Sequence, residues 1–210
     1  IFDEFTEKPH IFENGKIKRI EPLKHFEIYN FEGIGKQKVY SISHTEVITF
    51  ARAFKDKGIK HVRYFAGFPE HSFSVIKTLM DLRFHSKRAI KFNNEHIKPL
   101  DFTTQLMKSI SYPKGYKEIE NIWVKIKGEK DGKKKDSEMN CLVKTLSGWE
   151  SSGSNIDTGM TISIMSQMLK KGLIKGSGVM APESVVPHTE FFNELAKRKM
   201  YVLHDGRRIN

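Results

Sequence analysis

Hydrophobic and polar residues alternate over much of the first fifty positions of the chain. The alternation covers segments 15–20, 25–29 and 38–42, and a period of two is typical of strands that bury one face. Asn14-Gly15 and Gly33-Ile-Gly35 separate these segments with residues that favour turns. We therefore expect a group of strands joined by short turns at the start of the chain.

Further along, apolar residues three or four positions apart predict helices, and two more stretches alternate as strands do. The predicted helices span about 43–57, 69–84, 99–110, 155–171 and 187–199, and the further strands span 61–66, 122–127, 137–145 and 200–204. Strands and helices do not alternate regularly. This order favours an α+β fold, with a mixed, largely antiparallel sheet covered by helices, over a doubly wound parallel sheet.

The helix predicted at 155–171 is unusually apolar. No charged residue lies between Asp157 and Lys170, and apolar side chains cover more than one face of the helix. Asn155 or Asp157 is suited to cap its start, and Gly159 allows another group to approach its first turn closely. We expect this helix to lie between two layers or two domains.

The charge of the chain narrows its partners. The net charge is +11, which attracts nucleic acid, an anionic membrane surface or a small polyanion such as a dinucleotide. Six lysines between positions 125 and 135 flank the turn dipeptide Asp131-Gly132, which predicts a solvated hairpin tip. Only Trp123 lies close enough to interleave an aromatic ring with these lysines, so nucleic-acid binding is not favoured.

Several classes of protein are disfavoured. Cys141 is the single cysteine and is interpreted as a buried small hydrophobe within a strand, so no internal disulfide is expected. No secretion signal is recognisable, and the apolar stretches are shorter than the roughly 20 residues that span a bilayer. We expect a cytoplasmic protein, and the start at Ile1 without an initiator methionine favours a chain cut from a longer one.

Motifs for common chemistries are missing. The nucleophile motif Gly-x-Ser-x-Gly is absent, and none of the nine histidines forms a His-x-x-x-His pair, so no metal site is predicted. The segment that begins Gly33-Ile-Gly35 has Lys38 where a dinucleotide-binding loop needs its third glycine, and a strand follows it. We interpret it as a hairpin turn. The catalytic acid or base stays unassigned.

The segment from His61 to His71 is the first candidate site. It carries Arg63 on a strand that ends at glycine and proline, and ligands often lie at such strand-to-helix corners. The alternative is equally open: Arg63 is a surface residue, and Glu70 only complements a helix dipole.

The same segments resemble the saccharopine dehydrogenase family. The run Asp157-Thr-Gly-Met160, the phrase Gly178-Val-Met-Ala-Pro-Glu183 and the helix around Phe191 are similar to the family's C-terminal signature, and Arg63-Tyr-Phe-Ala-Gly-Phe-Pro-Glu70 resembles a segment of its substrate domain. The hairpin at Lys130-Asp-Gly132 is also similar. Asp157-Thr-Gly-Met-Thr-Ile162 departs from the common family pattern, which leaves the substrate open.

The resemblance implies the substrate-binding and C-terminal parts of an NAD- or NADP-dependent oxidoreductase that acts on the CH–NH group of an amino acid of the saccharopine or lysine type. It implies a substrate-binding domain at 1–155, and a bridging helix and C-terminal segment at 156–210 that pack towards an N-terminal Rossmann domain absent from this sequence. A homodimer is expected, and this part alone is expected to be inactive. Substrate contacts are then expected from His44, Arg63, Tyr64, Phe68 and Glu70, and cofactor contacts from Thr158 and Gly159.

Two rival interpretations remain. In the first, the chain is a basic nucleic-acid-binding module with the same fold, and its affinity for duplex DNA or RNA falls steeply with salt. Alternatively, it is a dimerisation domain without a ligand, in which substitutions at Arg63 and His44 are silent.

Overall fold

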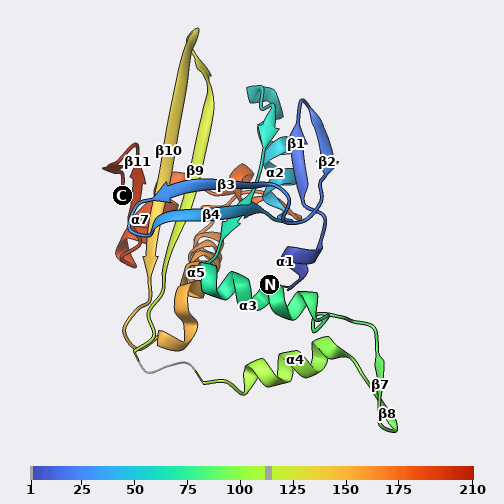
Figure 1. Ribbon diagram of the computed structural model, residues 1–210. Coiled ribbons are helices and arrows are strands. Elements are labelled where there is room, and N and C mark those ends of the chain that lie inside the picture. Colours follow the sequence, from blue (N-terminus) through green and yellow to red (C-terminus); the bar gives the residue numbers. More distant parts are fainter. Residues whose placement is uncertain (1, 112–114) are drawn as a thin grey trace. The chain divides into compact units, whose positions relative to one another are not determined.

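The computed structural model describes residues 2–111 and 115–210 (Figure 1). The chain divides into two compact units. Unit 1 is formed by Ile1–Tyr29 and Lys36–Pro113, and unit 2 by Asn30–Gly35 and Lys114–Asn210. The short segment Asn30–Gly35 is the tip of a hairpin whose stem belongs to unit 1, so unit 2 is built from two separate stretches of sequence.

The strands of the first half form three small antiparallel sheets among the described residues. One has the order β2-β1-β5, one the order β3-β4-β6, and one is the hairpin β7-β8. The strands are β1 (His10–Glu13), β2 (Lys16–Arg19), β3 (Phe26–Phe31), β4 (Gly35–Ser41), β5 (His61–Val62), β6 (Phe65–Gly67), β7 (Ile90–Phe92) and β8 (Glu95–Ile97).

Helices of unit 1 supply much of its core. They are α1 (Phe2–Thr6), α2 (Glu46–Ala53), the 3₁₀ helix Lys55–Lys57, α3 (Glu70–Asp81) and α4 (Pro99–Lys108). Phe5 is 1% exposed, and its ring lies edge-on to Phe68 and Phe73 with centroid distances of 5.0 Å and 5.7 Å. Phe73 also stacks on Tyr40 at 4.6 Å. The first core is therefore mainly aromatic.

The long hairpin of unit 2 is the largest regular feature in the chain (Figure 1). Strand β9 (Ile119–Lys130) pairs antiparallel with β10 (Lys133–Lys144), and β11 (Val202–His204) and β12 (Arg207–Arg208) complete a sheet of order β12-β11-β10-β9. Asp131 and Gly132 have φ values of 53° and 72°. Two positive φ angles are what a two-residue type I′ turn requires, which confirms the turn predicted from Asp-Gly.

Helices of unit 2 bury one face of this sheet. They are the 3₁₀ helix Glu150–Asn155, α5 (Ile156–Lys170), α6 (Pro182–Val185) and α7 (His188–Lys197). Ile164 and Met168 of α5 are almost fully buried, and each contributes roughly 1.5–3 kcal/mol by leaving water. They pack with Cys141 of β10 and Leu195 of α7. The cysteine is thus buried within a strand, as its position predicts.

The start and end of α5 differ in how well they are capped. At the start, the Asn155 side chain makes no capping hydrogen bond, so its suggested capping role is wrong. At the end, Gly172 has a φ of 68°, and the Leu173 amide donates to the Met168 carbonyl at 2.9 Å. This is the C-terminal arrangement that glycine favours.

The α+β class predicted from the order of elements is confirmed, although the strands form several small antiparallel sheets and not one larger mixed sheet. The hairpin interpretation of residues 33–38 is also confirmed, because β3 and β4 flank this turn. The boundary at 155/156 concerns packing against a nucleotide-binding domain, and it stays a prediction.

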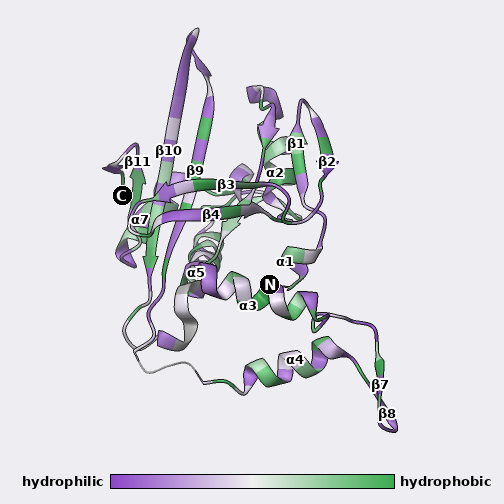
Figure 2. Ribbon diagram, in the orientation of Figure 1, coloured by the Kyte–Doolittle hydropathy of each residue, from purple (hydrophilic) through white to green (hydrophobic). Residues whose placement is uncertain are grey.

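Polar residues gather at the turn end of the β9–β10 hairpin (Figure 2).

Within residues 2–111 and 115–210, the structure contains no helix of the length and apolar character needed to cross a membrane.

Candidate functional site

Arg63 and Tyr64 lie where the chain passes between two sheets of unit 1. The strand predicted at 61–66 is divided: β5 pairs with β1, β6 pairs with β4, and the two residues connect them. Because neither residue takes part in a ladder, their side chains are not committed to the alternation of a sheet. A connection of this kind is a common place for binding groups.

Tyr64 stacks on His44. Their ring centroids are 3.9 Å apart and the ring planes differ by 7°. His44 lies between the end of β4 and the start of α2, and the Ile42 amide donates to the Tyr64 carbonyl at 3.4 Å. The structure therefore brings together two residues that the sequence places twenty positions apart.

The surroundings of His44 favour the neutral form of its ring. Burial lowers its pKa, and the negative charge of Glu4 opposes the shift. The Nδ1 atom lies against the Glu46 carboxylate. A neutral imidazole has one donor and one acceptor nitrogen, so it can hydrogen-bond either to an ammonium group or to a carboxylate.

Arg63 pairs with a carboxylate of its own unit. Its Nη2 atom lies 3.4 Å from Glu13 Oε1, and its side chain is 37% exposed. Glu13 makes a shorter contact of 2.7 Å with Lys18, and the pKa of Glu13 is lowered first by Lys18 and then by Arg63. The contact with Glu13 uses one of the five N–H donors of the guanidinium. Arg63 therefore has the capacity to bind a second carboxylate.

Tyr29 is the neighbour that the sequence did not identify. Burial and the hydrogen bond to Glu27 raise its pKa to about 12, and the positive charge of Arg63 opposes this. Tyr29 and Arg63 are far apart in sequence and carry no shared motif. Only the three-dimensional structure shows that Tyr29 lies near the guanidinium.

Phe68 and Glu70 follow the same segment but occupy different surroundings. Phe68 packs against Phe5 in the aromatic core. Glu70 is exposed at the first residue of α3, where a negative charge complements the helix dipole. Substrate contacts from these two residues remain predictions.

Thr158 and Gly159 belong to unit 2 and are both exposed in the first turn of α5. A Cβ built on Gly159 meets no atom within 4 Å, so there is room beside it. However, the Asp157 carboxylate accepts hydrogen bonds from the Thr158 amide and hydroxyl, and its charge repels a phosphate. This turn does not fit a dinucleotide phosphate by itself, and cofactor contact at Thr158 and Gly159 stays a prediction.

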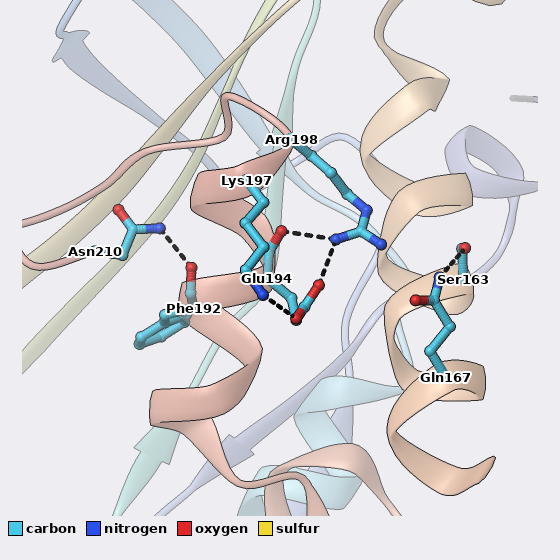
Figure 3. A network of polar contacts seen from close by, with 7 residues as sticks. All are labelled: Ser163, Gln167, Phe192, Glu194, Lys197, Arg198 and Asn210. Atoms are coloured by element: carbon cyan, nitrogen blue, oxygen red, sulfur yellow. Dashed lines mark hydrogen bonds and ion pairs between the residues drawn. The ribbon is translucent and has the colours of Figure 1, made fainter. Parts of the chain in front are cut away.

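Polar contacts lie along α7 and between α7 and the last residue (Figure 3). Glu194 pairs with Lys197 at 2.6 Å and with Arg198 at 2.8 Å, and these contacts lower its pKa to about 2. The Asn210 amide donates to the carbonyls of Phe192 and Met200. The Asn210 hydrogen bonds tie the last residue of the chain to α7.

A shallow pocket of about 200 Å³ lies between α5 and α7. Its floor includes Ile164 and Met168, and Glu194 on its wall is already satisfied by cations of its own helix. We assign it no substrate. Among residues 2–111 and 115–210, no three histidine, cysteine or acidic side chains gather as metal ligands would.

A comparison with known protein families covers most of the chain. The model of the family described as Saccharopine dehydrogenase C-terminal domain matches residues 1–200. The match spans nearly all of both units and includes every predicted site residue. The chain therefore belongs to the saccharopine dehydrogenase C-terminal domain family, part of an NAD(P)-dependent family of oxidoreductases.

Proposed function

We propose that unit 1 binds the amino-acid substrate of an NAD(P)-dependent oxidoreductase that acts on a CH–NH group of the saccharopine or lysine type. The observation that carries the proposal is the stack of His44 on Tyr64, immediately beside Arg63. The three residues offer a cation, an imidazole and a phenol, and Arg63 and Tyr64 form a connection between two sheets. Family membership supplies the class of reaction.

Arg63 is proposed to hold a substrate carboxylate. A guanidinium binds carboxylates through two parallel hydrogen bonds, which a lysine does not offer. The contact with Glu13 is long, at 3.4 Å, and Glu13 keeps Lys18 as a partner when Arg63 turns towards a ligand. Substrate binding then exchanges one carboxylate for another at Arg63.

His44 is proposed to orient the amine end of the substrate. Its ring plane is fixed by Tyr64, and its neutral form accepts a hydrogen bond from an ammonium group. A nicotinamide cofactor, held mainly by the nucleotide-binding domain, would supply the hydride chemistry at the carbon next to the amine. Residues of this chain bind and orient the substrate.

The C-terminal segment at 156–210 is proposed to pack against the nucleotide-binding domain of the same polypeptide. Ile162 and Leu169 of α5 are 57% and 60% exposed, although the helix carries no charge between Asp157 and Lys170. Apolar side chains left in water on a helix of this composition support a partner surface. A homodimer and a cytoplasmic location belong to the same proposal.

The direct experiment measures NAD(P)H formation by the full-length protein, which contains this domain and the proposed nucleotide-binding domain. Saccharopine and lysine are each supplied with NAD and with NADP. Turnover of one of them is the expected result. If neither is oxidised and duplex DNA binds with a steep salt dependence, the nucleic-acid interpretation replaces the proposal.

A further inference from the structure

The β9–β10 hairpin has two faces of different charge. Directly opposed residues of an antiparallel pair point to the same side of the sheet. Lys130 lies opposite Lys133, and Lys135 lies opposite Gly128, so all three lysines share one face. We call these three residues the basic face. From Val124 to Lys130 and from Lys133 to Met139, no carboxylate shares it.

The other face carries the same number of lysines, but each has an acidic partner across the strands. Lys125 lies opposite Glu138, Lys127 opposite Asp136, and Lys134 opposite Glu129. The first pair has a nitrogen-to-oxygen distance of 3.9 Å. We call these lysines the paired face. Its charges cancel, so the attraction for an anion is concentrated on the basic face.

Apolar side chains continue the basic face towards the base of the hairpin. Ile122, Val124 and Ile126 occupy alternate positions of β9 and are 41%, 44% and 63% exposed. We call these three residues the apolar row. Their parity along β9 is that of Lys130, so the row and the lysines lie on the same side.

Strand β9 also lies at the edge of its four-stranded sheet. A two-residue turn is closed by a hydrogen-bonded pair, so the main-chain N–H and C=O groups of Lys130 and Lys133 pair with each other across the hairpin. Lys127 then falls in a non-hydrogen-bonded pair with Asp136 and directs its main-chain N–H and C=O away from β10. Such an edge accepts another strand.

We propose that β9 binds an extended segment of a partner protein by strand addition. The segment has apolar side chains at alternate positions that cover the apolar row, followed by acidic side chains that meet the basic face. Main-chain hydrogen bonds provide affinity, and the alternating side chains provide specificity. This surface belongs to unit 2 and uses none of the residues proposed to bind substrate.

The charges also separate this partner from other occupants. In a second copy, Glu120 is the β9 carboxylate on the same side as the basic face. The antiparallel register that places Glu120 opposite Lys130 also places Lys125 opposite Lys125, which is a like-charge contact. A single nucleic-acid strand needs aromatic rings for stacking. Trp123 points to the paired face and contacts Phe31.

The test uses a labelled synthetic peptide and fluorescence anisotropy with the chain of residues 1–210. The acidic peptide has valine at alternate positions of its first half and glutamate at alternate positions of its second half, with threonine between them. A second peptide has lysine in place of glutamate, and a third is methylated on alternate backbone nitrogens. We expect only the acidic, unmethylated peptide to bind.

Two triple variants provide the matched comparison. K130A/K133A/K135A removes the basic face, and K125A/K127A/K134A removes the same charge from the paired face. The first is expected to weaken peptide binding by about tenfold or more, a difference of ~1.4 kcal/mol, and the second by less than about threefold. All six lysines are exposed, so both variants should fold.

Several outcomes overturn the proposal. They are the absence of binding at millimolar peptide, an equal loss in both triple variants, and unchanged binding of the methylated peptide. Binding of duplex DNA or anionic vesicles through the basic face, with no peptide binding, assigns the surface to another class of partner. Sedimentation of the chain as a dimer, with no peptide binding, assigns the surface to a second copy.

Discussion

Phe31 packs edge-on against Trp123, with ring centroids 5.6 Å apart and an interplanar angle of 87°. Phe31 belongs to the hairpin tip Asn30–Gly35, and Trp123 lies on β9, so the contact joins the two separate stretches of unit 2. A hydrogen bond accompanies it: the Asn121 side chain donates to the Glu32 carbonyl at 3.1 Å. The tip is therefore a structural part of unit 2.

A double-mutant cycle measures this contact. Phe31→Leu and Trp123→Leu keep an apolar side chain but remove the aromatic pair. We expect a coupling free energy of about 0.5–1.5 kcal/mol from urea unfolding followed by circular dichroism. The cycle of Phe92→Leu, an exposed ring of β7, with Trp123→Leu should show no coupling. Additive effects of Phe31 and Trp123 would contradict the contact.

Gly33 tests how closely the tip approaches β10. A Cβ built on this residue lies 2.9 Å from Leu142 Cδ2, and its φ of 74° is unfavourable for other residues. Gly15 has a similar φ of 79° but nothing within 4 Å. Gly33→Ala should therefore lower the free energy of unfolding more than Gly15→Ala, whose cost is about 1 kcal/mol. Equal losses would mean that Leu142 moves aside freely.

The lowered pKa of Glu194 predicts that the stability of the fold falls at acid pH. Its pKa falls from the ordinary 4.5 to about 2 in the folded protein because Lys197 and Arg198 donate to its carboxylate. A lowered carboxyl pKa stabilises the fold above pH 4.5, and the contribution is lost as the pH falls from 4.5 towards 2. Thermal melts should show a steeper loss over this window in the unsubstituted chain than in Glu194→Gln. Glu190→Gln, on the same helix, is the control, and identical slopes for all three would contradict the assignment.

Substitution of Gly159 distinguishes an effect on the stability of α5 from an effect on cofactor binding. Glycine within a helix costs roughly 0.5–1 kcal/mol relative to alanine, and no atom of the described structure fills the space beside it. Gly159→Ala should raise the melting temperature of the 210-residue chain. In the protein with its nucleotide-binding domain, it should weaken NAD(P) binding. Stabilisation without any loss of cofactor affinity would exclude the predicted close approach.

Much of the fold follows from local sequence patterns. The sequence predicts helices α3, α4, α5 and α7 and the β9–β10 hairpin, because their apolar periodicity is sustained and their ends carry turn residues. Strand β1, helix α1 and the strands β7 and β8 are not predicted, since each has only three to five residues. Segments this short depend on tertiary contacts, not on local periodicity.

The candidate site was predictable only in part. Arg63, Tyr64 and His44 stood out through their chemistry and the family resemblance. The division of the predicted strand at Arg63 was not predictable, because it depends on β5 and β6 joining different sheets. Glu13 and Tyr29 carry no motif, and their proximity to Arg63 arises from tertiary structure alone.

The substrate KM of the Arg63→Ala enzyme, with Arg88→Ala as the matched control, decides whether unit 1 binds a substrate carboxylate through Arg63. Arg88 is an exposed arginine of the same unit. If Arg63 binds the substrate carboxylate, its replacement raises KM by about tenfold or more, on the order of 1.4 kcal/mol, while Arg88→Ala leaves KM unchanged. An unchanged KM in Arg63→Ala would remove Arg63 from the substrate site and contradict the account.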